Sequence, residues 1–180
     1  MLRRLLLLAA LVGGPAAFAL DRWLARRRGP HPVEPMRMLV VIDAPVEQTW
    51  AIVSDIALQP EWMHEMKAVT METPGPARPG ARGTALVRIA GISVSDPVEI
   101  VAVEPPRRFA IRHLGLFTGG GEITLEPSAD GRATVVRWEE RLVPPLLPDL
   151  GSLVQAPILR SIFQADLMRL KRLVEQGGVA

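Results

Sequence analysis

The sequence predicts an α+β domain in which one antiparallel sheet is covered by a long C-terminal helix. Three observations lead to this expectation: an apolar strand followed by helical segments, six further strand-like runs separated only by turns, and a long amphipathic stretch at the end of the chain. A single sheet must bury one face, and the closing helix is the only large apolar partner left for it. The two should therefore pack together.

The bulk composition limits the function classes to which the chain can belong. A chain of 180 residues is about one domain, and 48% hydrophobic residues suffice for a sizeable core. There is no cysteine, which excludes disulfides, thiolate zinc sites and a cysteine nucleophile. The histidines His31, His64 and His113 lack metal-ligand spacing. We therefore expect no metal and no other cofactor.

The basic charge of the chain lies in its N-terminal segment. The sequence pI is about 9.9, yet residues 1–35 hold six arginines against two acids, a net charge of +4. Residues 36–180 hold fifteen basic side chains against seventeen acids, a net charge of −2. Phosphate binding needs a one-sided excess of positive charge, so nucleic acid is not an expected partner.

The first 28 residues read as a membrane anchor or a signal segment. A basic start is followed by an apolar run to Leu20 and then by four arginines. In one interpretation the run stays uncleaved as a single N-terminal anchor, extended by snorkelling arginines and by Trp23 at the interface. In the other it is a secretory signal cleaved near Ala19, after which the protein is exported. The side of the membrane that the domain faces is left open.

Proline and turn signals divide the rest of the chain. Residues 29–35 form a proline-rich linker, and the ligand-binding domain is expected over 36–176. A strand over 38–42 precedes a helix that opens at Ala44-Pro45, and a second short helix is interrupted at Pro60. The further strands are predicted at 67–73, 82–91, 92–103, 107–116, 119–127 and 133–143.

The C-terminal helix is predicted from about Ala156 to Gln176, where two glycines end it. Pro157 either starts its regular part or kinks an earlier turn. The glycine run 119–121 is not a phosphate loop, because a strand rather than a helix follows it. A tight hairpin or a bend in the sheet is the better account of these glycines.

The segments "VVIDAPVEQTWAIVSDIALQPEWMHEMKAV" and "VEIVAVEPPRRFAIR", together with the single long C-terminal helix, resemble the START-like superfamily, also called SRPBCC. This superfamily groups polyketide cyclase/dehydrase and lipid-transport proteins. The resemblance implies a helix-grip fold: a curved seven-stranded antiparallel sheet wraps the last helix, and two short helices between strands 1 and 2 close one end of a hydrophobic cavity. The superfamily shares no universal catalytic residue, so none is carried over.

The alternation of strand residues places two polar side chains in the expected cavity. His113 shares a face with Phe109 and Ile111, and Glu140 shares a face with Val136 and Trp138. A histidine and a glutamate in an apolar cavity are candidates for an acid/base pair, although such groups more often orient a ligand or are simply hydrogen-bonded. His113 and Glu140 are the only catalytic candidates in the sequence, and the signal for them is weak.

Two tryptophans lie close together near the start of the domain. Trp50 lies on the apolar face of the first helix and is expected in the core. Trp62 follows Pro60 at the position of the family's P-x-W turn, and is expected near the cavity entrance, where its side chain either lines the pocket or simply packs against its neighbours. The expected ligand-binding residues are Trp62, Met71, Phe109, His113, Trp138, Glu140 and Phe163.

The leading hypothesis is a membrane-associated module that binds or transfers a hydrophobic small molecule of the lipid, quinone or isoprenoid class. The alternative is a cyclase/dehydratase-type enzyme that uses the His113 and Glu140 pair. A coenzyme-Q-binding chaperone and a purely structural role with a filled core are further possibilities, of which the last predicts no useful cavity.

Overall fold

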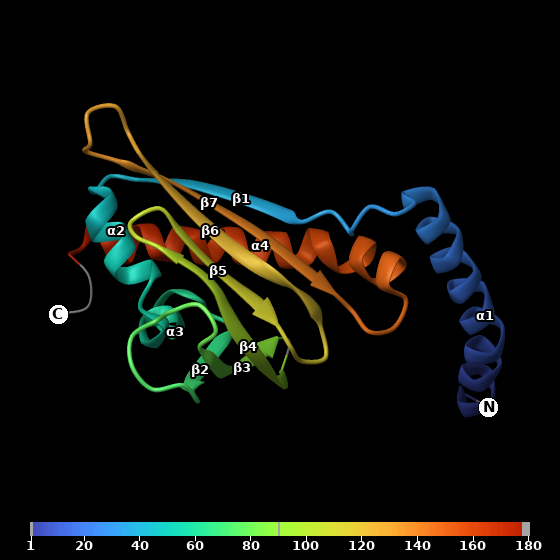
Figure 1. Cartoon of the computed structure of the whole chain (residues 1–180). Helices are drawn as coiled ribbons and strands as arrows, with labels where there is room; N and C mark the ends of the chain where they lie inside the picture. Colours follow the sequence, from blue (N-terminus) through green and yellow to red (C-terminus); the bar gives the residue numbers. More distant parts are fainter. Residues whose placement is uncertain (1, 90, 178–180) are drawn as a thin grey trace.

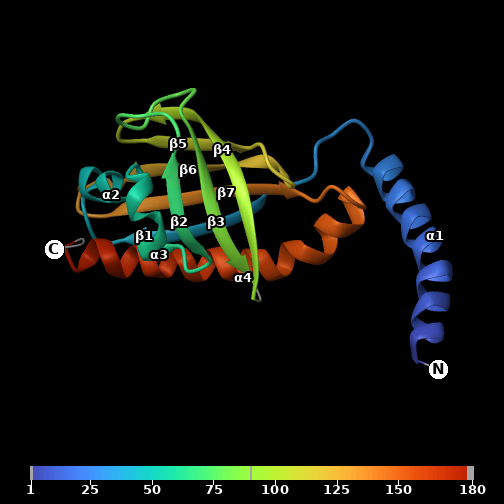
Figure 2. The same ribbon diagram turned by 90° about the horizontal axis from the view of Figure 1, so that it is seen from below.

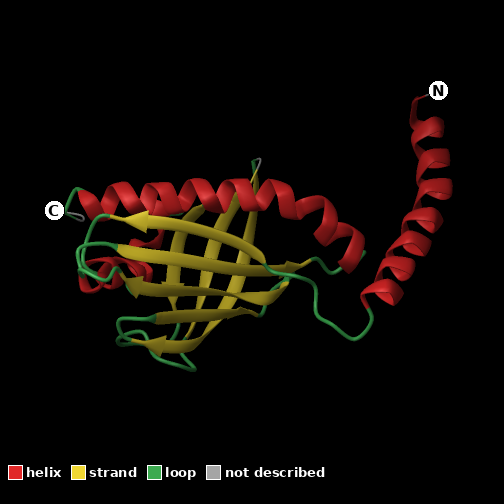
Figure 3. Ribbon diagram, turned by 90° about the horizontal axis from the view of Figure 1, so that it is seen from above, coloured by secondary structure: helices red, strands yellow, loops and turns green. Residues whose placement is uncertain are grey.

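The computed structural model describes residues 2–89 and 91–177. Seven antiparallel strands form one curved sheet, and the last helix runs across one of its faces (Figures 1 and 3). The predicted α+β class and helix-grip architecture are confirmed. The elements are α1 (Leu2–Arg28), β1 (Met36–Ile42), α2 (Val46–Val53), η1 (Ile56–Leu58), α3 (Gln59–Trp62), β2 (Met66–Met71), β3 (Arg82–Ile89), β4 (Ile92–Glu104), β5 (Arg108–His113), β6 (Thr118–Pro127), β7 (Thr134–Val143) and α4 (Pro148–Glu175).

The sheet is a meander closed by its first strand. Strands β2 to β7 pair with their neighbours in chain order, and β1 pairs antiparallel with β7, so that the order is β1-β7-β6-β5-β4-β3-β2. Met36 lies opposite Glu140, and Ile42 lies opposite Thr134. The first strand of the domain is thereby held beside the last one, against α4.

The core lies between the sheet and the C-terminal half of α4. Every second residue of β1 is buried, as expected for a strand with one solvent-facing side. These side chains belong to one hydrophobic cluster with Leu167, Leu170 and Val174 of α4, all three fully buried. Trp50 of α2 is half-buried and packs against this cluster, in line with its predicted core position.

The short helices α2, η1 and α3 cover one end of the molecule, between β1 and β2 (Figure 2). The Asp55 side chain accepts a hydrogen bond from the Ala57 N–H at the start of η1. The prediction that Pro60 interrupts a helix was wrong. Pro60 lies in the first turn of α3, where a residue without an N–H is tolerated because that N–H would have no acceptor within the helix.

Helix α4 begins at Pro148, eight residues before the predicted start at Ala156. Its first turn receives a cap from a distant part of the chain: Asp21 Oδ1 accepts hydrogen bonds from the N–H groups of Asp149 and Leu150, at 2.9 and 2.8 Å. Pro157 lies inside the helix. The N-terminal part of the helix is bent relative to the rest (Figure 3). Such a bend is expected where a proline removes a backbone hydrogen bond.

Helix α1 contacts the domain only near its C-terminal end and otherwise extends away from it (Figure 2). The Arg28 guanidinium binds both carboxylate oxygens of Asp149, at 2.5 and 3.2 Å, and Asp21 is only 4% exposed. Within the residues described, no helix is both long and apolar enough to cross a membrane. The predicted spanning anchor stays a prediction.

Candidate functional site

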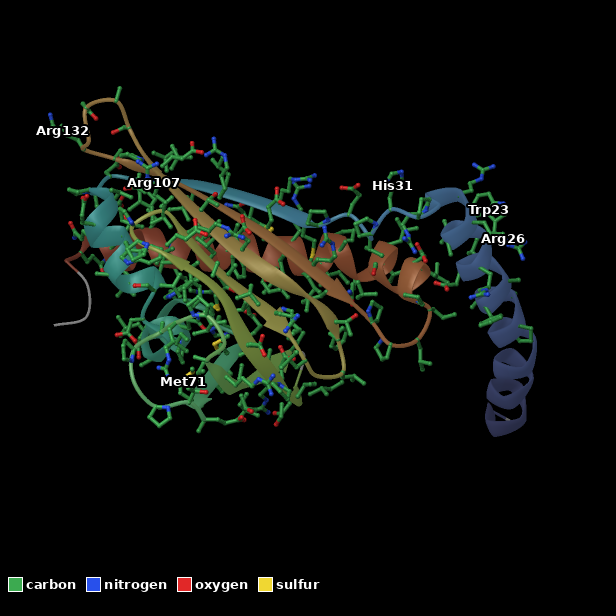
Figure 4. The ribbon with its side chains drawn as sticks, viewed as in Figure 1. Trp23, Arg26, His31, Met71, Arg107 and Arg132 are labelled. Carbon is green, nitrogen blue, oxygen red and sulfur yellow. The ribbon has the colours of Figure 1, made fainter. Side chains whose placement is uncertain are left out.

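A cavity of about 480 Å³ lies between the sheet and α4. Its wall is formed by the inner faces of β2 to β7, by the α3 region and by the middle of α4, and most of the lining side chains are apolar. A volume of this size is typical of pockets that enclose a small organic molecule. Figure 4 shows one of the lining residues, Met71, on β2.

The opening of the cavity lies between the β3–β4 hairpin and α4. Ile92 at the start of β4 and Ile158 on α4 both line the cavity, yet they are 69% and 61% exposed. The cavity therefore meets solvent through an apolar rim.

One polar cluster interrupts the apolar wall. The His113 ring is held between two carboxylates: Nδ1 lies 2.6 Å from Asp96 Oδ2, and Nε2 lies 2.9 Å from Glu140 Oε1. Trp138 Nε1 donates a hydrogen bond of 3.0 Å to Glu140 Oε2. The histidine and glutamate side chains are 9% and 5% exposed, so this cluster is shielded from bulk water.

The two carboxylates determine the charge of the imidazole. Burial alone lowers the pKa of His113, because it disfavours the charged ring. The hydrogen bonds that the ring donates to Asp96 and Glu140, together with the negative charges of these two groups, outweigh burial and raise the pKa to about 9. His113 is therefore an imidazolium at neutral pH, and both of its N–H groups point at carboxylate oxygens.

The glycine run creates the space in which Glu140 lies. Gly121 of β6 is paired with Glu140 of β7, and a Cβ at position 121 would come within 2.3 Å of Glu140 Oε2. A Cβ at Gly119, whose φ is 124°, would come within 2.0 Å of the Arg141 carbonyl oxygen, and one at Gly120 within 2.4 Å of the Ile111 carbonyl oxygen. The run is thus part of β6 and not a hairpin turn, and its lack of side chains admits the carboxylate.

A second polar group lies at the α3 side of the cavity. Asp166 of α4 lines the cavity and accepts hydrogen bonds from the His64 N–H and from Arg169 Nη1, at 3.0 and 2.5 Å. Burial is the main cause that raises its pKa to about 6, with the charge of Glu65 acting in the same direction. Glu65 Oε2 is itself buried without a hydrogen-bond partner.

The structure brings most of the predicted site residues together. Trp62 is the exception: it is fully buried and is not part of the cavity wall, and it lies behind Trp138 in an edge-to-face contact with ring centroids 6.0 Å apart. Its predicted place near the entrance was wrong, and of the two roles left open for its side chain the structure shows plain packing, because α3 turns the indole into the core. A role for any of these residues in ligand binding stays a prediction. The cavity is lined by Met71, Phe109, His113, Trp138, Glu140 and Phe163.

Sequence reasoning missed several residues of the site, among them Asp96, Gly121 and Asp166. Asp96 lies on the same face of β4 as Val94 and Val98, so the alternation that placed His113 inward contained the signal for it. Gly121 had a weaker signal, since glycine inside a strand often marks the close approach of another group. Asp166 also had a signal, because it lies three residues after Phe163 and four before Leu170, on the apolar stripe of the C-terminal helix.

Among the described residues, no group of histidine, aspartate and glutamate side chains is arranged to hold a metal ion. The cluster around His113 is instead joined by direct hydrogen bonds between its members. Its chemistry is that of proton exchange and hydrogen bonding.

Comparison with solved structures supports the fold. A Deinococcus radiodurans protein is 27% identical, with 81% of this chain and 99% of that chain covered and a TM-score of 0.58. A Thermus thermophilus protein is 18% identical over 81% of this chain and 99% of its own, with a TM-score of 0.64. The Zhui aromatase/cyclase from a Streptomyces species is 16% identical over 81% and 98%, with a TM-score of 0.58.

Comparison with protein families assigns the chain. No curated protein matches it. The model of the family described as polyketide cyclase / dehydrase and lipid transport matches residues 36–175, which span the sheet, the short helices and nearly all of α4. The resemblance noted in the sequence is therefore confirmed, and the chain belongs to the polyketide cyclase / dehydrase and lipid transport family.

Proposed function

We propose that the protein binds a hydrophobic small molecule in the cavity between the sheet and α4. The observation that carries the proposal is the cavity itself: about 480 Å³, mostly apolar in lining, and open to solvent between Ile92 and Ile158. Transfer of an apolar molecule from water to such a wall is favourable by roughly 25 cal/mol per Å² buried. Lipids, quinones and isoprenoids are the ligand classes that we expect.

A variant that fills the cavity tests this proposal. Ala85 of β3 is buried and lines the cavity, while its neighbour Leu86 points outward and is 40% exposed. Ala85→Phe should abolish binding of the neutral fluorescent probe Nile red, and Leu86→Phe should leave it unchanged. Native mass spectrometry of the gently purified protein should show a bound apolar species in the wild type only. Equal Nile red binding by wild type and Ala85→Phe would exclude the cavity as the binding site.

Attachment to a membrane surface through α1 is the second part of the proposal. Phe18, Leu20 and Trp23 are exposed on α1, and Arg27 stacks over the Trp23 ring at 4.2 Å. Exposed aromatic and basic side chains on one helix favour an interfacial position on anionic lipid. Figure 4 shows Trp23 and Arg26 on α1, away from the sheet.

Vesicle co-sedimentation tests the attachment. The full-length chain should bind vesicles that contain anionic lipid, and the variant Phe18→Glu/Trp23→Glu should bind them much less. An equally exposed pair elsewhere, Leu114→Glu/Leu116→Glu in the β5–β6 connection, serves as the control. Equal binding by the wild type and the α1 variant would remove α1 from the proposal.

A cyclase/dehydratase-type activity is the second candidate function. It is favoured by the imidazolium of His113 between two carboxylates in the cavity, and by the aromatase/cyclase name of a neighbour in fold. In a dehydration, a carboxylate takes the proton from carbon and the imidazolium gives its proton to the departing hydroxyl, so that one water leaves. The observed geometry engages both imidazole N–H groups, and one hydrogen bond must break before His113 can act as the acid.

Mass spectrometry of extracted ligands separates the two candidates. An enzyme of this type releases a product lighter by one water, and Glu140→Gln should accumulate the heavier precursor. A binding module returns the same ligand mass from the wild type and from Glu140→Gln.

A further inference from the structure

The charged groups that line the cavity are almost all acidic. Four carboxyl side chains reach the wall, and the only group there that becomes cationic is the His113 imidazole. None of the arginines and lysines in the described part of the chain lines the cavity, although the sequence has 21 of them. With His113 protonated and all four carboxyl groups ionised, the lining carries an excess of negative charge. The four acids are Glu65, Asp96, Glu140 and Asp166.

The polar cluster has no hydrogen-bond donor left for a ligand. Both His113 ring nitrogens lie at hydrogen-bond distance from carboxylates, and Trp138 Nε1 donates to Glu140. A carboxylate offers about four lone-pair sites on its two oxygens. Asp96 therefore keeps Oδ1 free, and each Glu140 oxygen keeps a second acceptor site. The cluster therefore offers hydrogen-bond acceptors to a ligand in the cavity, whereas all of its donors are already engaged in hydrogen bonds within the cluster.

The α3 side of the cavity has the same character. Glu65 lines the cavity, and its Oε2 is a buried acceptor without a hydrogen-bond partner. The remaining side-chain donors in the lining belong to the neutral amides Gln59 and Gln155, and Gln155 already donates to the Leu142 carbonyl. An anionic head group would meet carboxylates at both ends of the cavity and no cation that is free to pair with it.

We propose that the ligand is an apolar molecule whose polar end donates hydrogen bonds, as a hydroxyl or an ammonium group does, and that the cavity rejects carboxylate and phosphate amphiphiles. The inference rests on the proposed binding function and narrows its ligand class. Among the expected classes it favours isoprenoid alcohols and hydroquinones over quinones, fatty acids and phospholipids, because only the first two combine a hydroxyl donor with the absence of a carboxylate or phosphate group.

A set of naphthalene probes of nearly equal size tests the proposal. The probes are 2-naphthol as the hydroxyl donor, 2-naphthylmethylammonium as the cationic donor, 2-methoxynaphthalene without a donor, and 2-naphthoate as the anion. Each is used to displace Nile red from the full-length protein at neutral pH. We expect at least one of the two donor probes to bind roughly tenfold more tightly than 2-methoxynaphthalene, since a hydrogen bond to a charged group is the difference. We expect no displacement by 2-naphthoate.

Variants locate the donor preference in the His113 cluster. Glu140→Gln replaces a carboxylate by an amide that has its own N–H, and should reduce the preference for donor probes to about twofold or less. Glu139→Gln changes the neighbouring residue, which is exposed on the other face of β7, and should keep the full preference. If Glu140→Gln does not fold, Asp96→Asn takes its place, because it removes charge from the same cluster.

The outcomes separate the two proposals. Binding of 2-naphthoate as tight as that of 2-naphthol, or equal affinity for all four probes, overturns the inference while leaving the binding function intact. Failure of the wild type to bind Nile red overturns both. A preference for donor probes that is unchanged in Glu140→Gln and in Asp96→Asn also overturns the inference, because the acceptors then lie elsewhere.

Discussion

Gly121 and Glu140 face each other across the β6–β7 pair, and the Glu140 carboxylate occupies the space that a side chain at position 121 would need. This relationship holds Glu140 against the His113 ring. The local shape of the sheet, and not only the presence of acidic and basic residues, thus builds the polar cluster.

Replacing Gly121 should disturb this cluster directly. A Cβ at position 121 lies 2.3 Å from Glu140 Oε2, so Gly121→Ala must displace the carboxylate or the strand. Overpacking of this kind costs about 1–3 kcal/mol of stability. Urea unfolding measures the loss, and a histidine NMR titration should show the pKa of His113 moving back toward its ordinary value. Gly14→Ala, where nothing lies within 4 Å of the added atom, is the control. Equal stability of the wild type and Gly121→Ala would contradict the geometry.

Stability should depend on the protonation of His113. Its pKa is raised from 6.5 in the unfolded chain to about 9 in the fold. The stabilisation is therefore fully present below pH 6.5 and is lost as the pH rises through 9. A shift of this size corresponds to about 3 kcal/mol. Urea unfolding of the wild type at a series of pH values should show the decline, and His113→Gln should flatten it. A parallel decline in both proteins would assign it to other groups.

The two buried tryptophans should respond differently to the loss of their indole N–H. Trp138 Nε1 donates to Glu140, whereas Trp62 Nε1 is buried without a partner. Trp138→Phe leaves a buried carboxylate oxygen unpaired, which costs about 1–3 kcal/mol beyond the lost ring volume. Trp62→Phe removes an unsatisfied donor and should cost less. Chemical unfolding of the two variants gives the order, and a larger loss for Trp62→Phe would refute this account.

The contact between α1 and α4 should contribute to the stability of the domain. Asp21 Oδ1 accepts the N–H groups of Asp149 and Leu150 in the first turn of α4. Asp21→Ala should destabilise the protein by about 1–2 kcal/mol, as the loss of a helix cap does. Asp21→Asn keeps an acceptor oxygen and should lose less. Thermal unfolding of both variants, with the exposed neighbour changed in Arg22→Ala as control, checks the order.

Much of the fold was predictable because it depends on local patterns. The strand boundaries agree with the structure to within a few residues, since alternation and turn residues act over short distances. The same alternation placed His113 and Glu140 inward, and both line the cavity. Applied to β4, it would also have placed Asp96 there.

The remaining features depend on groups that are distant in the sequence. The start of α4 at Pro148 was missed because its cap comes from Asp21, which lies far before it in the chain. Trp62 was misplaced because the direction of its side chain follows from how α3 packs, and not from its position after Pro60.

The sequence by itself therefore determined the α+β class, the succession of the strands and the inward faces of β5 and β7, because these follow from the period of a strand and the residues of its turns. Only the tertiary structure decided that β1 pairs with β7, that Asp96 and Glu140 hold His113 between them, and that the cavity wall offers acceptors without basic side chains. These are relations between strands far apart in the chain, and they exist only once the sheet has curved around α4.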